Sequence, residues 1–151
     1  MIPAFSRLHA KVSGNRSALL LSGLLAGSGV LHFAVPAPYD ALVPKVLPGS
    51  PRTWTKVSGA AELAVAAAVA LPQTRRVGGL AAAGLFAAVY PANVQMAYDW
   101  RNASAWKRYV AYGRLPLQAP LIGWALIVRG TGNGTGGGTG RGTPGGTRDN
   151  G

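Results

Sequence analysis

Residues 77–98, VGGLAAAGLFAAVYPANVQMAY, form a run of 22 positions without a formally charged side chain. A helix of this length reaches about 33 Å at roughly 1.5 Å per residue, which matches the hydrocarbon core of a bilayer. The short basic turn at residues 72–76 separates this run from an alanine-rich run at residues 53–71. We therefore expect an antiparallel hairpin of two membrane-spanning helices.

Two further apolar runs lie on either side of this hairpin. Residues 17–36, SALLLSGLLAGSGVLHFAVP, follow a basic segment at residues 1–16 and are long enough to span. A signal peptide is the alternative, but its apolar region is about 7 to 15 residues long and here more apolar runs follow. Residues 115–128 are the weakest span, because they are few and contain Pro116 and Pro120; this helix could start earlier, near Tyr109. The predicted fold is an all-α, integral membrane four-helix bundle over residues 17–129.

Composition and charge favour a membrane protein over a soluble one. The chain is 48% hydrophobic and 13% charged, whereas soluble domains are roughly 25% charged. Its net charge of +11 suits anionic lipid headgroups, and its basic residues form no nucleic-acid-binding motif, so we expect the lipid bilayer and no nucleic acid as partner. The absence of cysteine excludes disulfides and thiolate chemistry.

Two connecting segments, residues 37–52 and 99–114, fall on one side of the predicted bundle. They hold or adjoin the aromatic residues expected at the headgroup level, namely Tyr39, Trp54, Tyr98, Trp100, Trp106, Tyr109 and Tyr112. The second segment either lies partly flat in the interface or forms an ordinary solvated loop. The basic flank of the first helix favours both termini in the cytoplasm, with the chain as a multi-pass membrane protein.

The C-terminal segment differs in kind from the rest of the chain. Residues 130–151 are built largely from glycine and threonine and hold no apolar residue that could form a core. Because glycine loses the most backbone entropy on ordering, we expect a disordered, low-complexity tail.

Glu62, the only glutamate in the chain, falls in the middle of the second span. A charged carboxylate at that depth costs several kcal/mol, so it needs a protonated form, a partner or water. Ser58 lies one turn earlier on the same face, and Gly59 would let a neighbouring helix approach closely. The patterns Gly23-x-x-x-Gly27 and Gly84-x-x-x-Ala88 are further expected packing sites.

Each of the other three spans carries polar residues toward the aromatic side. His32 and Ser28 share a face of the first span, Asn93 lies near the end of the third, and Gln118 lies near the start of the fourth. We expect these side chains to meet Glu62, and we expect Pro91 to leave the carbonyl of Ala87 as a free acceptor beside them. Two interpretations stay open: a polar pocket that accepts protons or a ligand, and a hydrogen-bonded network that only sets helix register.

An ordered set of short motifs between about residues 29 and 126 resembles the DoxX-like family of small bacterial membrane proteins. The set is Gly29-x-x-His32-Phe33, Pro44, Leu47-Pro48, Ser58-Gly59-x-x-Glu62, Leu71-Pro72 with Arg75-Arg76, Pro91-Ala92-Asn93 and Leu117-Gln118. The resemblance implies a four-helix membrane protein in which His32, Glu62 and Asn93 match the family's polar positions. It also implies a link to redox assemblies, because the family includes small subunits similar to those of a thiosulfate:quinone oxidoreductase.

Three function classes follow from these patterns. The first is an accessory subunit of a quinone-linked membrane redox assembly, with quinone as the ligand and a redox enzyme as the partner. The second is a proton-coupled small-molecule transporter, for which four helices are few unless the chain forms a homo-oligomer. The third is a structural membrane protein without a ligand. An autonomous enzyme is disfavoured, since the chain lacks a cysteine nucleophile and paired haem or metal ligands, and no intrinsic cofactor or metal is expected.

Overall fold

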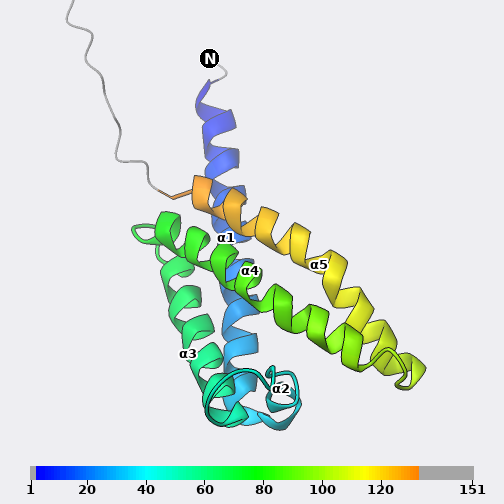
Figure 1. Ribbon diagram of the computed structural model, residues 1–151. Helices are drawn as coiled ribbons and strands as arrows, with labels where there is room; N and C mark the ends of the chain where they lie inside the picture. The colour runs from blue at the N-terminus through cyan, green and yellow to red at the C-terminus, as the bar shows by residue number, and fades with distance from the viewer. Residues whose placement is uncertain (1–2, 133–151) are drawn as a thin grey trace, which may run out of the picture.

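The computed structural model describes residues 3–132 and is all-helical over that range, without a strand. The helices are α1 (Pro3–Ala34), α2 (Ala37–Asp40), α3 (Pro51–Ala70), α4 (Arg75–Asp99) and α5 (Ala105–Gly130) (Figure 1). The predicted all-α class is thus confirmed. The predicted tail begins at the last helical residue, and nearly all of it lies outside the described residues.

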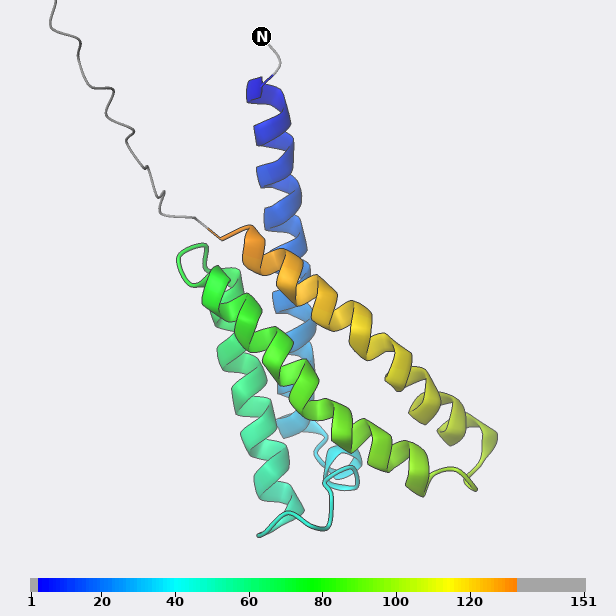
Figure 2. The same cartoon turned by 45° about the horizontal axis from the view of Figure 1, so that its top comes forward.

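The four long helices form two antiparallel pairs. α1 packs along α3, and α4 packs along α5, while α3 and α4 share a smaller contact. Figure 2 shows the pairs close together near the turn between α3 and α4 and apart at the opposite end, where α2 lies between them. Both predicted connecting segments lie at this open end, as expected. We call it the α2 end.

The main hydrophobic core lies where the two pairs converge. All four long helices contribute to it, through small and branched side chains: Ala18, Leu21, Leu25, Ala66, Val69, Ala82, Ala83, Ala125 and Val128. A second, smaller cluster joins α4 and α5 toward the α2 end and consists of Met96, Ala97 and Ala111. The stretch between these clusters is where the polar side chains of α4 and α5 are buried.

The outward faces of the helices are apolar. Large hydrophobic side chains are exposed on every long helix, with Leu20 66% exposed on α1, Val57 54% on α3, Val77 68% on α4 and Ile127 67% on α5. Two helical segments, Gly14–Ala34 and Arg75–Asp99, are long and apolar enough to cross a membrane. α3 and α5 do not meet the same criterion, because α3 is rich in alanine and α5 carries several basic residues.

Two helix boundaries differ from the sequence-based expectation. α1 begins at Pro3, so the basic segment at residues 3–16 continues the first helix; proline suits a first helical position, where its missing N–H needs no acceptor. α5 begins at Ala105, so residues 105–114 are neither a solvated loop nor a separate interfacial helix. Pro116 and Pro120 lie inside this continuous helix, and Gln118 is therefore near its middle.

Glycines allow the close helix contacts, although not all at the expected positions. A Cβ on Gly59 would lie 2.7 Å from the Cβ of His32 and 3.0 Å from the carbonyl oxygen of Gly29, so this glycine permits the α1–α3 crossing as predicted. Gly23, Gly27 and Gly84 face open space, so these glycines of the two small-residue patterns make no close helix contact within the chain.

Two further glycines hold α4 in place. A Cβ on Gly78 would meet the backbone of α3 at 2.6 Å, and one on Gly79 would meet the backbone of α5 at 2.7 Å. This glycine pair therefore fixes the converging end of the two helix pairs.

The converging end is also held by a buried arginine. Arg75 is 3% exposed, and its guanidinium donates to the carbonyls of Val69 and Ala70 at 3.1 Å and to Asn15 Oδ1 at 2.7 Å. The two carbonyls belong to the last turn of α3, where no intrahelical donor reaches them. Arg75 therefore caps α3 and ties it to α1 and α4.

Candidate functional site

A pocket of about 620 Å³ opens between the two helix pairs on the side of α2. Most of its wall is apolar. It comes from α4 and from residues 37–50, here called the α2 segment, with Leu42, Val43, Leu47, Leu85 and Val89 among the lining residues. A second pocket of about 270 Å³ adjoins it between α1, α4 and α5. Ser28, Glu62, Asn93 and Arg114 line both, so these polar residues form the boundary between the two spaces.

α1 and α3 supply one polar pair of the pocket. His32 Nδ1 lies 2.8 Å from the Ser28 carbonyl, and because a carbonyl only accepts, Nδ1 is the donor. The same nitrogen lies 3.5 Å from Glu62 Oε2. The His32 ring also stacks on Tyr39 of α2, with centroids 3.8 Å apart. These contacts fix the ring orientation and hold it beside the acid.

Glu62 is buried with an incomplete set of partners. Its side chain is only 9% exposed. The Nδ1 proton of His32 is already directed at Ser28, and Glu62 Oε2 has no hydrogen-bond partner among the described residues. A buried acceptor without a donor costs about 1–3 kcal/mol, so the carboxyl is incompletely satisfied by the residues around it.

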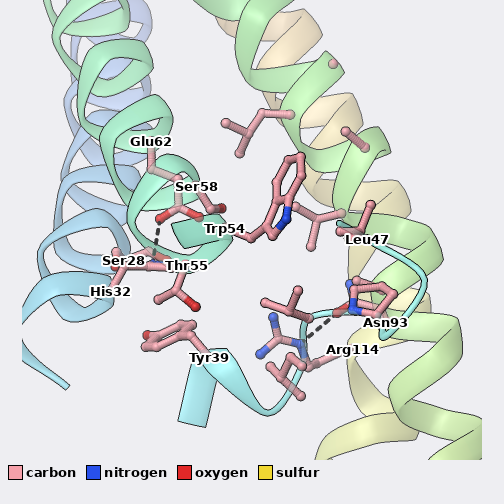
Figure 3. A pocket seen from close by; sticks show the side chains of 18 residues that line it. Ser28, His32, Tyr39, Leu47, Trp54, Thr55, Ser58, Glu62, Asn93 and Arg114 are labelled. Atoms are coloured by element: carbon pink, nitrogen blue, oxygen red, sulfur yellow. Dashed lines mark hydrogen bonds and ion pairs between the residues drawn. The ribbon is translucent and has the colours of Figure 1, made fainter. Parts of the chain in front are cut away.

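α4 and α5 supply the opposite polar group. Asn93 Nδ2 donates to Gln118 Oε1 at 3.1 Å, and Arg114 Nε donates to Asn93 Oδ1 at 3.1 Å. Gln118 Nε2 donates in turn to the Phe86 carbonyl of α4. The chain of bonds leaves the outer nitrogens of the Arg114 guanidinium free to point into the pocket (Figure 3).

The two polar groups face each other across the pocket. Figure 3 shows Glu62 and His32 on one side and Arg114 with Asn93 on the other, with Tyr39 near the α2 end and Trp54 along the wall. No ion pair between Glu62 and Arg114 is present among the described residues, although both line the pocket and carry opposite charge types. The arrangement leaves room for a small polar group between a carboxyl and a guanidinium.

The six residues expected from the sequence are brought to these two pockets. Ser28, His32, Ser58, Glu62 and Asn93 line the larger one, and Gln118 lines the smaller one. They do not form one hydrogen-bonded cluster; they form two groups on facing helix pairs. Gln118 bonds the Phe86 carbonyl in the turn before Pro91, and not the neighbouring Ala87 carbonyl that Pro91 was expected to leave as an acceptor.

Arg114 is the functional candidate that the sequence interpretation missed. It is the last residue of the segment at residues 99–114, which the sequence predicts to connect two helices because the fourth helix is expected to start later. Its spacing of four from Gln118 was the available signal, since residues four apart share a helix face. Once α5 begins at Ala105, Arg114 and Gln118 both face Asn93.

The rim of the pocket carries a second acid, Asp40, in the short helix α2. Arg52 Nε donates to its Oδ2 at 2.8 Å. The Thr55 hydroxyl faces the carboxylate without closing a full hydrogen bond, and together with Arg52 it lowers the pKa of the Asp40 carboxyl, outweighing the rise that burial causes. This pair joins α2 to the start of α3 and so holds the pocket rim.

Comparison with known proteins gives one family and no individual relative. No curated protein and no solved structure matches the chain. A family model described as "Domain of unknown function (DUF8561)" matches residues 21–129, which covers both pockets and more than half of the chain. The chain therefore belongs to the DUF8561 family.

Proposed function

We propose that this chain is a multi-pass membrane protein of a bacterial inner membrane that binds a lipophilic, quinone-like molecule in the larger pocket. In this role it is an accessory subunit of a quinone-linked redox assembly, and a partner enzyme carries out the electron transfer. The resemblance to DoxX-like proteins supports this role and stays a prediction, since the DUF8561 match names no activity.

The proposal has α1, α3, α4 and α5 each crossing the bilayer, with both termini in the cytoplasm. The exposed apolar side chains on all four helices support it, because a soluble bundle buries such faces. The 20 residues of α3 reach about 30 Å, enough for the hydrocarbon core. Between Val57 and Leu71 its only charged residue is Glu62, which points inward rather than toward lipid.

The observation that carries the proposal is an acid and an arginine facing each other in a mostly apolar pocket. Ligand sites combine mostly apolar walls with a few polar groups that orient the ligand, and a volume of about 300–1,000 Å³ is typical. Ionisable residues inside a membrane are costly and mark functional sites. A ring with oxygen substituents and an apolar tail fits such a site, with its tail leaving toward lipid.

The test is to fill the pocket without disturbing the helices. Gly84 lines the pocket, and a Cβ there meets nothing within 4 Å, so Gly84→Leu places a side chain in the ligand space. Gly23→Leu is the matched control, because Gly23 also lies in a helix and faces open space but lines neither of the two pockets. Both variants are purified in mild detergent, and bound lipophilic molecules are identified by mass spectrometry.

We expect the native chain and Gly23→Leu to retain a quinone-like molecule that Gly84→Leu loses. Equal retention by both variants, or no enrichment over a detergent and lipid blank, would count against the binding role. A redox partner that co-purifies with the native chain, and whose quinone-dependent activity falls with Gly84→Leu, supports the accessory role.

A proton-coupled transporter is the second candidate, favoured by the way the two pockets adjoin at Glu62 and Arg114. Solute uptake into vesicles driven by a pH gradient, and abolished by Glu62→Gln, would select it. A purely structural role predicts no bound molecule and only a lower melting temperature for the same variant.

A further inference from the structure

Glu62 and Arg114 each have hydrogen-bonding positions that no described residue fills, and these positions restrict which head group the pocket can bind. The Glu62 carboxyl lines the pocket and makes no hydrogen bond among the described residues, and the outer nitrogens of Arg114 point into the same pocket from the opposite side. Arginine has donors only, so it requires an acceptor oxygen. A carboxyl accepts when ionised and also donates when protonated. A ligand that bridges them must therefore present an oxygen acceptor to Arg114. At its other end it needs a donor for an ionised Glu62 or an acceptor for a protonated one.

A hydroxyl satisfies the Glu62 side in either protonation state, because it donates to a carboxylate and accepts from a carboxylic acid. A carbonyl pairs only with the protonated acid and is repelled by the carboxylate. At the other end, the oxygen of a hydroxyl or of a carbonyl serves Arg114 equally well. Only the Glu62 end of the pocket therefore distinguishes a hydroxyl from a carbonyl.

Two aromatic side chains line the pocket between Glu62 and Arg114. Tyr39 is stacked on His32, and Trp54 is fixed by donation of its Nε1 hydrogen to the Pro48 carbonyl at 2.7 Å. Both rings line the pocket beside the acid and the arginine. A flat ring with oxygen atoms on opposite edges matches this space better than a flexible polar chain does, since aromatic faces favour ring contacts.

We propose that the pocket holds the dihydroxy, reduced form of a quinone-type ring in preference to its dicarbonyl, oxidised form, with one hydroxyl on Glu62 and the other oxygen on Arg114. This inference rests on the proposed function and adds the form of the ligand and its orientation. It concerns binding alone and requires no electron transfer by this chain.

The preference is expected to depend on pH through Glu62. The titratable pocket residues around Glu62 are His32 of α1 beside it, Tyr39 of α2, and Arg114 of α5 across the pocket; the pocket residues contributed by α4 are not titratable. When Glu62 is ionised, only the hydroxyl form pairs with it. When it is protonated, both forms pair, so acidification narrows the difference between them.

The experiment measures binding of decylubiquinol and decylubiquinone to the full-length protein in detergent, by calorimetry under argon at pH 8 and pH 5. At pH 8 we expect the quinol to bind at least about tenfold more tightly, the effect of one hydrogen bond to a charged group. As the pH is lowered and Glu62 takes up a proton, the ratio falls toward one. In Glu62→Gln the amide both donates and accepts, so the ratio is near one at both pH values, while Arg114→Gln weakens both forms.

Specific outcomes overturn the inference. Equal or tighter binding of the quinone at pH 8, or an unchanged tenfold preference in Glu62→Gln, shows that Glu62 does not select the hydroxyl form, while quinone-type binding itself survives. Binding of neither form above a detergent blank removes the proposed function as well. The ratio measured on the native chain keeps the test decisive if a variant fails to fold, since equal affinity for the two forms at pH 8 already contradicts the inference.

Discussion

His32 Nδ1 lies 3.5 Å from Glu62 Oε2, yet its proton is donated to the Ser28 carbonyl, so the histidine stands beside the acid without satisfying it. The contact is possible because α1 and α3 cross at two glycines, Gly29 and Gly59, whose backbones nearly touch. The geometry of the crossing thus sets the distance between the imidazole and the carboxyl.

The crossing predicts a strong effect of a single methyl group. Gly59→Ala places a Cβ 2.7 Å from the Cβ of His32, which forces the helices apart and destabilises the fold by about 1–3 kcal/mol. Gly23→Ala, where the new Cβ meets nothing, is expected to be neutral or to stabilise by up to about 1 kcal/mol through helix propensity. Thermal unfolding in detergent compares the two. Equal melting temperatures would mean that the helices do not cross at Gly59.

The arginine cap predicts a large difference between two adjacent residues. Arg75→Gln removes hydrogen bonds to the last turn of α3 and to Asn15, with an expected loss of about 2–4 kcal/mol, because buried acceptors are left unpaired. Arg76→Gln, at an exposed position, is expected to change stability by less than about 0.5 kcal/mol. Arg75→Lys rescues little, since a lysine lacks the planar fork. Unfolding in mixed micelles of mild detergent and dodecyl sulfate measures these changes, and a similar effect of both glutamine variants would rule out the cap.

The amide pair of α4 and α5 predicts coupled rather than additive effects. Gln118→Leu leaves Asn93 Nδ2 unpaired and costs about 1–3 kcal/mol. The double variant with Asn93→Leu is expected to cost less than the sum of the single variants by about 0.5–3 kcal/mol, because both partners are then apolar. Gln95→Leu, on the exposed face of α4, serves as control. The same unfolding titration reports the coupling, and additivity within about 0.5 kcal/mol would contradict the contact.

The rim acid predicts a dependence of stability on pH. The pKa of Asp40 is lowered in the folded protein by Thr55 and Arg52, so the pair stabilises the fold above the ordinary pKa of an aspartate. This contribution disappears as the pH falls through the lowered pKa. The difference in melting temperature between the native chain and Asp40→Asn should therefore shrink below about pH 4. Arg52→Gln raises the Asp40 pKa in an NMR titration, whereas Lys56→Gln, on an exposed cation of the same helix, does so much less; equal shifts would argue against the pair.

The fold class and the polar residues were predictable, because charge-free runs and isolated polar side chains are local features of the sequence. The start of α5 was not, since Pro116 and Pro120 suggest a break that packing against α4 overrides. A later expected start places Arg114 in a connecting segment, and not on the helix face that it shares with Gln118. The glycine contacts were also only partly predictable, because spacing shows which glycines share a face but not whether the face meets a helix or open space.

The arrangement of the polar residues in two facing groups depends on the divergence of the helix pairs, which no local pattern encodes. Gly78 and Gly79 hold the pairs together at one end, and the α2 segment lies between them at the other. The pocket is thus a property of the tertiary structure, while its chemistry comes from residues that stand out in the sequence.

The most direct test of the account is whether α3, which carries Glu62, crosses the bilayer. The native chain has no cysteine, so Val46→Cys and Gln73→Cys, at exposed positions before and after α3, each create a single labelling site. In intact inner-membrane vesicles of one orientation, a membrane-impermeant maleimide is expected to label only one of the two variants until detergent is added. Labelling of both variants from the same side would contradict the account, because Glu62 would then not lie within a membrane-spanning helix.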